Sequence, residues 1–302
     1  MPRVLGELGV TGPAALITAG WQEREHEPGV IADPGVPVVR LALHARGEQV
    51  FADDAELAEA YKARQLRLKE MQEFYRVRLD YAAQAARAVA VRSAGRTGRT
   101  GRSDPALVAE EQLASLALIR QIDRDHLDRC RAVHAAFEAA WQPRTRPVLA
   151  RQVAELRAAI EPTQAIVIAG GHVAVLLNRL RLFGIAELAG GRPIVAWSAG
   201  AMALTERVVL FHDDPPHGQA ISEILDTGLG LAPGLVVLPE PRLRLHLDDA
   251  VRVGEFAGRY APAVCVAMDH DAQIWVDGGR VIRTVLAQRL DPTGCVEAGW
   301  SP

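Results

Sequence analysis

Short runs of Val, Ile, Leu and Ala recur along the chain, and most end at glycine or in a polar loop. The clearest runs cover residues 14–20, 38–43, 164–169 and 193–197. A short apolar run bounded by turn residues is typical of a strand buried on both faces, and such strands belong to parallel sheets. The last two runs each lead into a segment with helical spacing. We therefore expect an α/β fold, a mostly parallel sheet with helices on both faces, with its core strands in residues 14–50 and 160–290.

Two much longer periodic segments interrupt this pattern. Residues 54–92 carry apolar side chains at helical spacing without Gly or Pro, and a second such segment covers residues 105–141. Asp104 followed by Pro105 is a good helix start, because an N-cap side chain precedes a proline in the first turn. Helices of this length extend ~50 Å at 1.5 Å per residue. The chain is thus predicted to be a single α/β domain, 1–302, with a helical insertion at about 54–142.

The connection between the two helices is a low-complexity segment, and we expect a flexible tip at 93–104. Glycine recurs there at every third position, with arginine and threonine between, so few apolar groups could offset the entropy of ordering. An arm with an apolar stripe usually buries it against a partner. A homodimer formed through the helical insertion is therefore predicted.

Composition narrows the classes of function. A chain of 302 residues with 49% hydrophobic and 24% charged residues can bury a sizeable core. A net charge of −3 gives no basis for nucleic-acid binding. Three scattered cysteines show no metal-ligand spacing and favour a reducing compartment. No run approaches the ~20 apolar residues of a membrane span, so we expect a cytoplasmic protein without a membrane partner. We also expect no metal and no cofactor.

Candidate chemistry lies in the run at 193–204, where an apolar strand stops at Ser198 and a helix begins. A serine raised on a tight strand-to-helix turn needs small neighbours, and Ala196, Ala199 and Gly200 provide them. This is typical of a nucleophile elbow with a strained backbone at the serine. The alternative is that Ser198 only caps the following helix.

A second strand and turn come about thirty residues earlier, where a buried run ends at Gly170 and Gly171. Glycine has no Cβ, so its amide can approach a ligand closely. Gly170 and Gly171 could thus supply one donor to an oxyanion, while the amide of Ala199 supplies the other. The alternative is a plain turn.

Four segments in this order resemble the peptidase E and cyanophycinase family of serine hydrolases, which has a class I glutamine amidotransferase-like, flavodoxin-like fold. The segments are residues 168–177, 196–201, 228–237 and 266–272. The resemblance implies that Ser198 is the nucleophile and that Gly171 lies over the oxyanion. It also implies cleavage of a peptide or amide bond in a small peptide substrate, aspartyl peptides among them.

A serine hydroxyl needs a base to take its proton, usually an imidazole. In the family this histidine follows the strand that comes after the Gly-Leu-Gly-Leu stretch of the third segment, but Glu240 occupies that position here. His246, six residues later, is the candidate base. His172, His212 and His270 remain alternatives, for which a structural or surface role is the competing interpretation.

Two places could supply the acid that orients the base. Asp213 and Asp214 lie at the distance from Ser198 that peptidase E-like members show, and Asp213 is preferred. Asp269 and Asp271 are the cyanophycinase-like choice. The resulting hypothesis is a serine hydrolase with Ser198, His246 and Asp213.

Two other functions remain open at this stage. One is a catalytically inactive family member that acts as a ligand-binding or regulatory protein, which Glu240 in the histidine position would favour. A glutamine amidotransferase is disfavoured, because that chemistry needs a thiolate at the elbow and no cysteine is there.

Overall fold

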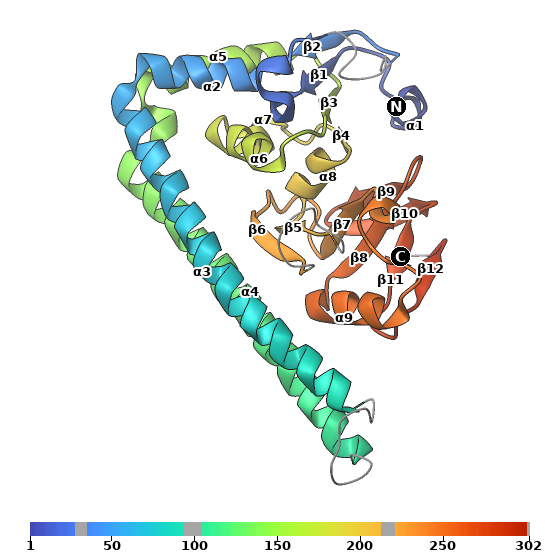
Figure 1. The fold of residues 1–302 in the computed structure, drawn as a ribbon. Coiled ribbons are helices and arrows are strands. Elements are labelled where there is room, and N and C mark those ends of the chain that lie inside the picture. The colour runs from blue at the N-terminus through green and yellow to red at the C-terminus, as the bar shows by residue number, and fades with distance from the viewer. Residues whose placement is uncertain (28–34, 94–103, 213–220, 301–302) are drawn as a thin grey trace.

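The computed structural model describes residues 1–27, 35–93, 104–212 and 221–300. An α/β body carries two long helices that run along one side of it and extend well beyond it (Figure 1). Within these ranges no helix combines the length and apolar character that crossing a bilayer requires.

The N-terminal half of the body is built on a four-stranded parallel sheet with strand order β2-β1-β3-β4. Its strands are β1 (Ala14–Ile17), β2 (Val38–Arg40), β3 (Ala165–Ile168) and β4 (Ile194–Ala196). Every residue of β1 and β3 is buried, because these two strands lie in the centre of the sheet. The expected α/β class and parallel sheet are confirmed here.

Alternation along the central strands divides the core between the two faces of this sheet. Ile17 and Ile166 point into the large cluster formed with helices α2, α5 and α6, whereas Leu16 and Val167 pack against α1. The helices of the body are α1 (Pro2–Glu7), α2 (Leu43–Asp53), α5 (Pro147–Ile160), α6 (Val173–Leu182), α7 (Ile185–Leu188), α8 (Ala199–Leu204) and α9 (Ala250–Tyr260). Short 3₁₀ turns are η1 (Ala19–Arg24), η2 (Pro143–Thr145) and η3 (Pro241–Leu243).

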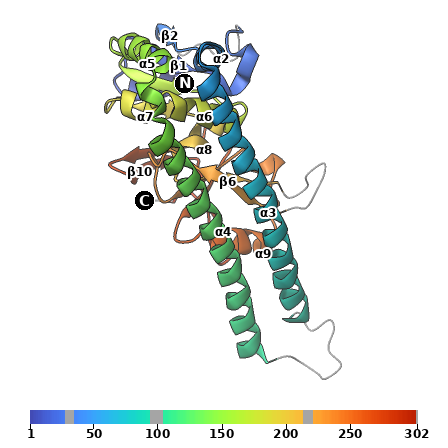
Figure 2. The ribbon, with the colours of Figure 1, turned by 90° about the vertical axis from the view of Figure 1, so that its left-hand side faces the viewer.

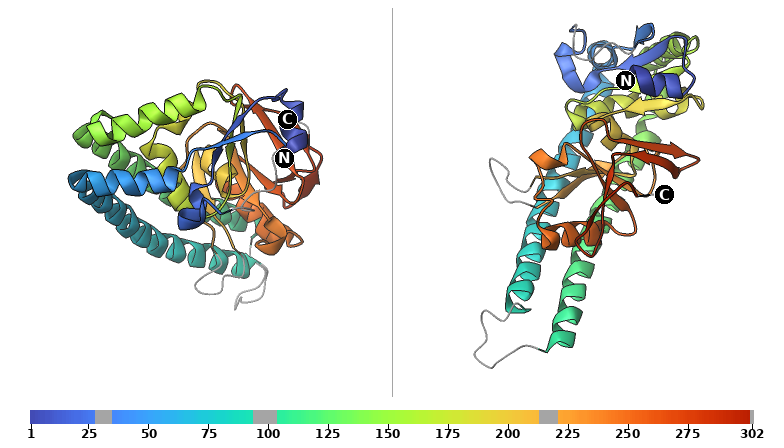
Figure 3. Two further views of the ribbon diagram at one scale, coloured as in Figure 1. Left: turned by 90° about the horizontal axis from the view of Figure 1, so that it is seen from above. Right: turned by 90° about the vertical axis from the view of Figure 1, so that its right-hand side faces the viewer.

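The C-terminal half does not continue the mostly parallel sheet that the sequence predicts, because most of its strand pairs are antiparallel. A second sheet has the order β12-β11-β8-β7, in which only β7 and β8 are parallel. Two separate antiparallel pairs, β5 with β6 and β9 with β10, complete the C-terminal half. The strands are β5 (Arg207–Leu210), β6 (Glu223–Thr227), β7 (Leu235–Pro239), β8 (Val264–Met268), β9 (Gln273–Asp277), β10 (Arg280–Val285), β11 (Gln288–Leu290) and β12 (Val296–Ala298). The body thus joins a parallel sheet to a mixed sheet, and the right-hand view of Figure 3 shows the N-terminal and C-terminal halves one below the other.

The two long helices are α3 (Ala55–Ser93) and α4 (Pro105–Trp141), which pack side by side in antiparallel fashion (Figure 2). The side chain of Asp104 accepts a hydrogen bond from the amide of Ala106, so the expected N-cap is present. Most of the predicted tip, residues 94–103, lies outside the described residues. We call α3 and α4 together the helical hairpin.

Buried polar groups fasten the helical hairpin to the body. The Arg259 guanidinium donates to both oxygens of Asp123 at 2.7 Å, and Tyr75 donates to the same carboxylate at 2.8 Å. Nearer the parallel sheet, Asp226 accepts a hydrogen bond from Arg181 at 2.6 Å and lies 2.9 Å from His134 Nε2. One face of the hairpin is therefore fixed against α9, β6 and α6.

Candidate active site

Ser198 stands between β4 and α8 with φ 52° and ψ −127°, a conformation that costs an L-residue free energy. The strained turn expected at this serine is present. The hydroxyl makes no cap hydrogen bond to α8, so helix capping does not account for the serine. The side chain is half-buried at the carboxyl end of the parallel sheet.

Close packing around the turn explains its small residues. A Cβ on Gly200 would lie 2.5 Å from the carbonyl oxygen of Ile168. A Cβ on Gly170 would lie 2.8 Å from Ser198 Cβ and 3.0 Å from Ser198 Oγ. The 2.5 Å and 2.8 Å distances are shorter than real Cβ atoms show, so the turn after β3 touches the serine only because residue 170 is glycine.

The turn after β1 completes this end of the sheet. A Cβ on Gly171, whose φ is +102°, would lie 2.4 Å from the carbonyl of Gly20, and His172 N–H donates to that carbonyl at 2.7 Å. The turns after β1, β3 and β4 thus converge on one point. Contact requires glycine at residues 20, 170 and 171, and at residue 171 the positive φ favours glycine as well.

Two backbone amides near the serine find no acceptor in the part of the chain that the structure describes. In the ranges described, neither Gly171 N–H nor Ala199 N–H donates a hydrogen bond, and Ala199 N lies 3.6 Å from the Cβ position of Gly170. Free amides beside a serine hydroxyl are the groups that stabilise an oxyanion in acyl transfer. The geometry is therefore compatible with the roles that the sequence suggested for both residues.

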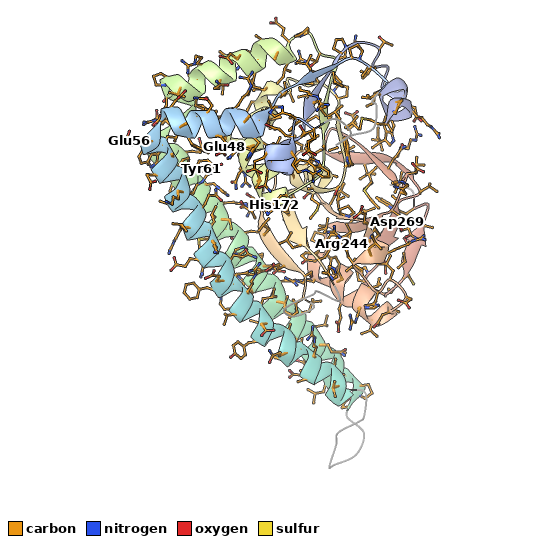
Figure 4. The ribbon with its side chains drawn as sticks, turned by 45° about the horizontal axis from the view of Figure 1, so that its top comes forward. Glu48, Glu56, Tyr61, His172, Arg244 and Asp269 are labelled. Carbon is orange, nitrogen blue, oxygen red and sulfur yellow. The ribbon has the colours of Figure 1, made fainter. Side chains whose placement is uncertain are left out.

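The Ser198 hydroxyl itself has no hydrogen-bond partner among the described residues. His172 is exposed and caps α6, its Nδ1 accepting from Val175 N–H at 3.4 Å. Figure 4 shows His172 close to the η1 turn, apart from Arg244 and Asp269 on the C-terminal half. Its position supports the structural interpretation of this histidine.

Glu240 follows β7 directly and adopts a left-handed conformation, with φ 51° and ψ 50°. Its amide donates to the carbonyl of Met268, and its exposed carboxylate lies 3.7 Å from Arg244 Nη2. The Arg244 guanidinium in turn lies 5.5 Å from the centre of the Phe211 ring. Glu240 is thus part of an ion pair at the surface of the loop after β7.

The other candidate bases are spread over separate loops. His246 lies between η3 and α9, is exposed, and lines a surface depression with Asp248, Asp249, Ala250, Val251 and Arg252. His212 is half-buried after β5, and its Nδ1 has no partner within the described ranges. His270 is exposed in the turn after β8.

The candidate acids also lie on separate segments of the chain. Asp213 and Asp214 lie outside the described residues. Asp269 forms a 2.6 Å ion pair with Arg242, and Asp271 sits at φ 63° in the β8–β9 turn. Asp269 is therefore held by an arginine from the loop that carries Glu240.

Three further residues with notable geometry are not among the candidates that the sequence motifs suggested. Arg242 and Arg244 bring positive charge to the end of β7, and Gln22 in η1 has φ 58° and ψ −128°, nearly the conformation of Ser198. Alternating arginines in residues 242–244 are the one signal that could have indicated the first two. Nothing in the sequence around Gln22 indicates a strained backbone.

No group of three or more His, Cys, Asp or Glu side chains in the described ranges is arranged to hold a metal ion. No protein-family model matches the chain, and no curated protein matches its sequence. The residues of the site therefore carry the functional argument alone.

Proposed function

We propose that the protein is a serine hydrolase that cleaves an amide or peptide bond in a small molecule through an acyl-enzyme on Ser198. One observation carries the proposal. A strained, non-capping serine at a strand-to-helix turn lies against a glycine turn, and the Gly171 and Ala199 amides near it donate to no described residue. Such a conformation costs about 1–3 kcal/mol, persists only where surrounding contacts hold it, and is found most often at functional sites.

In the proposed reaction, Ser198 Oγ attacks the substrate carbonyl while a base takes the hydroxyl proton. The carbonyl oxygen becomes an oxyanion that accepts hydrogen bonds from Gly171 and Ala199 N–H. The proton then passes to the leaving amine, and water releases the acyl group by the same route. His246 is the proposed base, and the peptidase E and cyanophycinase family with its class I glutamine amidotransferase-like fold is the proposed context.

A specific observation favours a second function, that of a binding protein without turnover. The Ser198 hydroxyl has no hydrogen bond among the described residues, and Glu240 occupies the histidine position of the family in an ion pair with Arg244. A carboxylate is a weaker base than an imidazole, so it takes a proton from a hydroxyl less readily. In this alternative the two amides hold the anionic group of a ligand.

Labelling with a serine-directed fluorophosphonate separates the two functions. A hydrolase should form one adduct on Ser198, found by mass spectrometry of the peptide, and Ser198→Ala should remove it. Ser115→Ala is the matched control, because Ser115 lies on α4 and donates only to the Glu111 carbonyl. Absence of labelling in the native protein would contradict the hydrolase proposal.

The base is tested by a second set of variants. His246→Ala should lower labelling by a factor of about 10² or more if His246 takes the proton, whereas His270→Ala, an exposed histidine in another turn, should leave it unchanged. If native labelling is absent and Glu240→His creates it, residue 240 is a vacated base position and the binding function is favoured.

A further inference from the structure

The helical hairpin has an apolar stripe on the side that faces away from the body. Leu66, Phe74, Val77, Tyr81 and Val91 of α3 are each more than half exposed. At 100° per residue these positions fall within about 100° of one another on the helix. The buried residues of α3, such as Tyr75 and Leu79, lie on the opposite side.

The neighbouring helix extends this stripe into a surface. On α4, Leu107 and Leu118 are exposed on one side of the helix, in line with Ala132 and Arg129. A groove of about 420 Å³ lies between the helices, lined by Arg67, Met71 and Phe74 of α3 and by Arg129, Ala132 and Val133 of α4. Figure 2 looks onto this side, and no other element lies in front of the two helices. We call it the outer face.

We propose that the outer face binds the outer face of a second copy of this chain, with the two hairpins antiparallel. The two-fold axis lies in the plane of the interface and is perpendicular to the helices. It makes α3 of one copy face α3 of the other, and α4 of one copy face α4 of the other. The interface is isologous, so each residue pair occurs twice. This surface is independent of the reaction proposed at Ser198.

Charge and shape fix the register of the two copies. Glu111 and Arg129 lie 18 residues apart on α4, which is five helical turns, so they share the outer side at a separation of about 27 Å. Neither side chain forms an ion pair with any described residue. With the axis at residue 120, Arg129 of one copy faces Glu111 of the other. The same axis places Leu107 of one copy opposite Val133, in the groove of the other.

The register of α3 agrees with this axis. Tyr75 donates to Asp123 and stacks on His126, so residue 120 of α4 lies level with about residue 79 of α3. An axis there places Val77 of one copy opposite Tyr81 of the other. The same axis thus brings apolar residues together both between the two copies of α3 and between the two copies of α4.

The available area is sufficient for a stable dimer. Residues 66–91 of α3 span about 39 Å, and two adjacent helices are about 20 Å wide, which gives about 800 Å² on each copy. A stable, specific interface buries about 800 Å² per partner. The outer face can therefore support a dimer without contacts from the body.

Sedimentation equilibrium of the full chain at micromolar concentration tests the dimer. The native protein should be dimeric, and Tyr81→Asp should raise the dissociation constant by about 10² or more, because it places a carboxylate in the apolar contact. Leu243→Asp is the matched control, since Leu243 is an exposed leucine on η3 of the body and should leave the dimer intact. Circular dichroism verifies that each variant keeps its helices.

Charge reversal tests the register. Arg129→Glu and Glu111→Arg should each weaken the dimer about tenfold, and the double variant should restore it, because reversed charges meet again across the axis. A monomeric native protein would overturn the proposal and leave the outer face to a different partner. A dimer in which the double variant is weaker than either single variant would overturn the antiparallel register.

Discussion

At the scale of single residues, the site depends on backbone conformations that few side chains adopt. Ser198 and Gln22 share almost the same φ and ψ, yet only the serine follows a strand of the parallel sheet and precedes a helix. Gly170 lies against Ser198 with no room for a Cβ. The serine is thus held in a costly conformation by contacts on several sides.

Ser198→Gly should stabilise the fold. Glycine adopts φ 52° and ψ −127° without the steric cost that serine carries, and this gain exceeds the entropy that glycine adds to the unfolded state. We expect the free energy of unfolding in urea to rise by about 1 kcal/mol. Ser115→Gly, within α4, should lower it by ~0.5–1 kcal/mol. A loss of stability in Ser198→Gly would show that the serine is not strained.

This part of the site is predictable from the sequence because small residues report close packing directly. Gly170 lies against Ser198, as the two successive strand-turn-helix units suggested, and Gly171 is the next residue of that turn. The position of a catalytic base is not predictable in the same way. His246 follows an irregular loop whose path depends on ion pairs such as Asp269 with Arg242, and no periodicity encodes these.

At the scale of elements, helical periodicity predicted α3 and α4 almost to the residue, whereas the second sheet was not foreseen. β11 and β12 are three residues long and include the polar residues Gln288, Arg289 and Glu297, so they lack the apolar runs that identified β1 and β3. The sequence also does not show how the helical hairpin is fastened. That depends on Asp123 and Arg259, which are 136 residues apart.

Asp123→Ala should detach the middle of α4 from α9. The change leaves the buried Arg259 guanidinium without its carboxylate and removes the acceptor for Tyr75 O–H. Breaking a buried ion pair typically costs ~3–5 kcal/mol, measured as the free energy of unfolding in urea. Asp128→Ala, which breaks the exposed pair with Arg131, should cost no more than ~1 kcal/mol. Equal losses in both variants would contradict a buried anchor.

At the scale of the whole molecule, one cluster connects three parts that are distant in sequence. Asp226 on β6 meets His134 of α4 and Arg181 of α6, and Arg181 also donates to Thr227 Oγ1 at 2.6 Å. Burial alone would raise the pKa of Asp226. The hydrogen bond with His134 and the charge of Arg181 outweigh burial and lower the pKa to about 2.

The low pKa of Asp226 makes the attachment of the helical hairpin sensitive to acid. Because the carboxyl ionises more readily in the folded than in the unfolded chain, its contribution is complete above the unfolded pKa of ~3.9. About 2 kcal/mol should be lost as the pH falls from about 5 toward 2. In Asp226→Asn this dependence is absent, so the difference in unfolding free energy from the native protein should shrink as urea titrations move from pH 6 to pH 3. Asp128→Asn, at an exposed carboxyl, should show a small difference at every pH. If the difference for Asp226→Asn stays constant over this range, the Asp226 carboxyl does not lose a proton there on unfolding, and the pairing with His134 and Arg181 does not stabilise its charge.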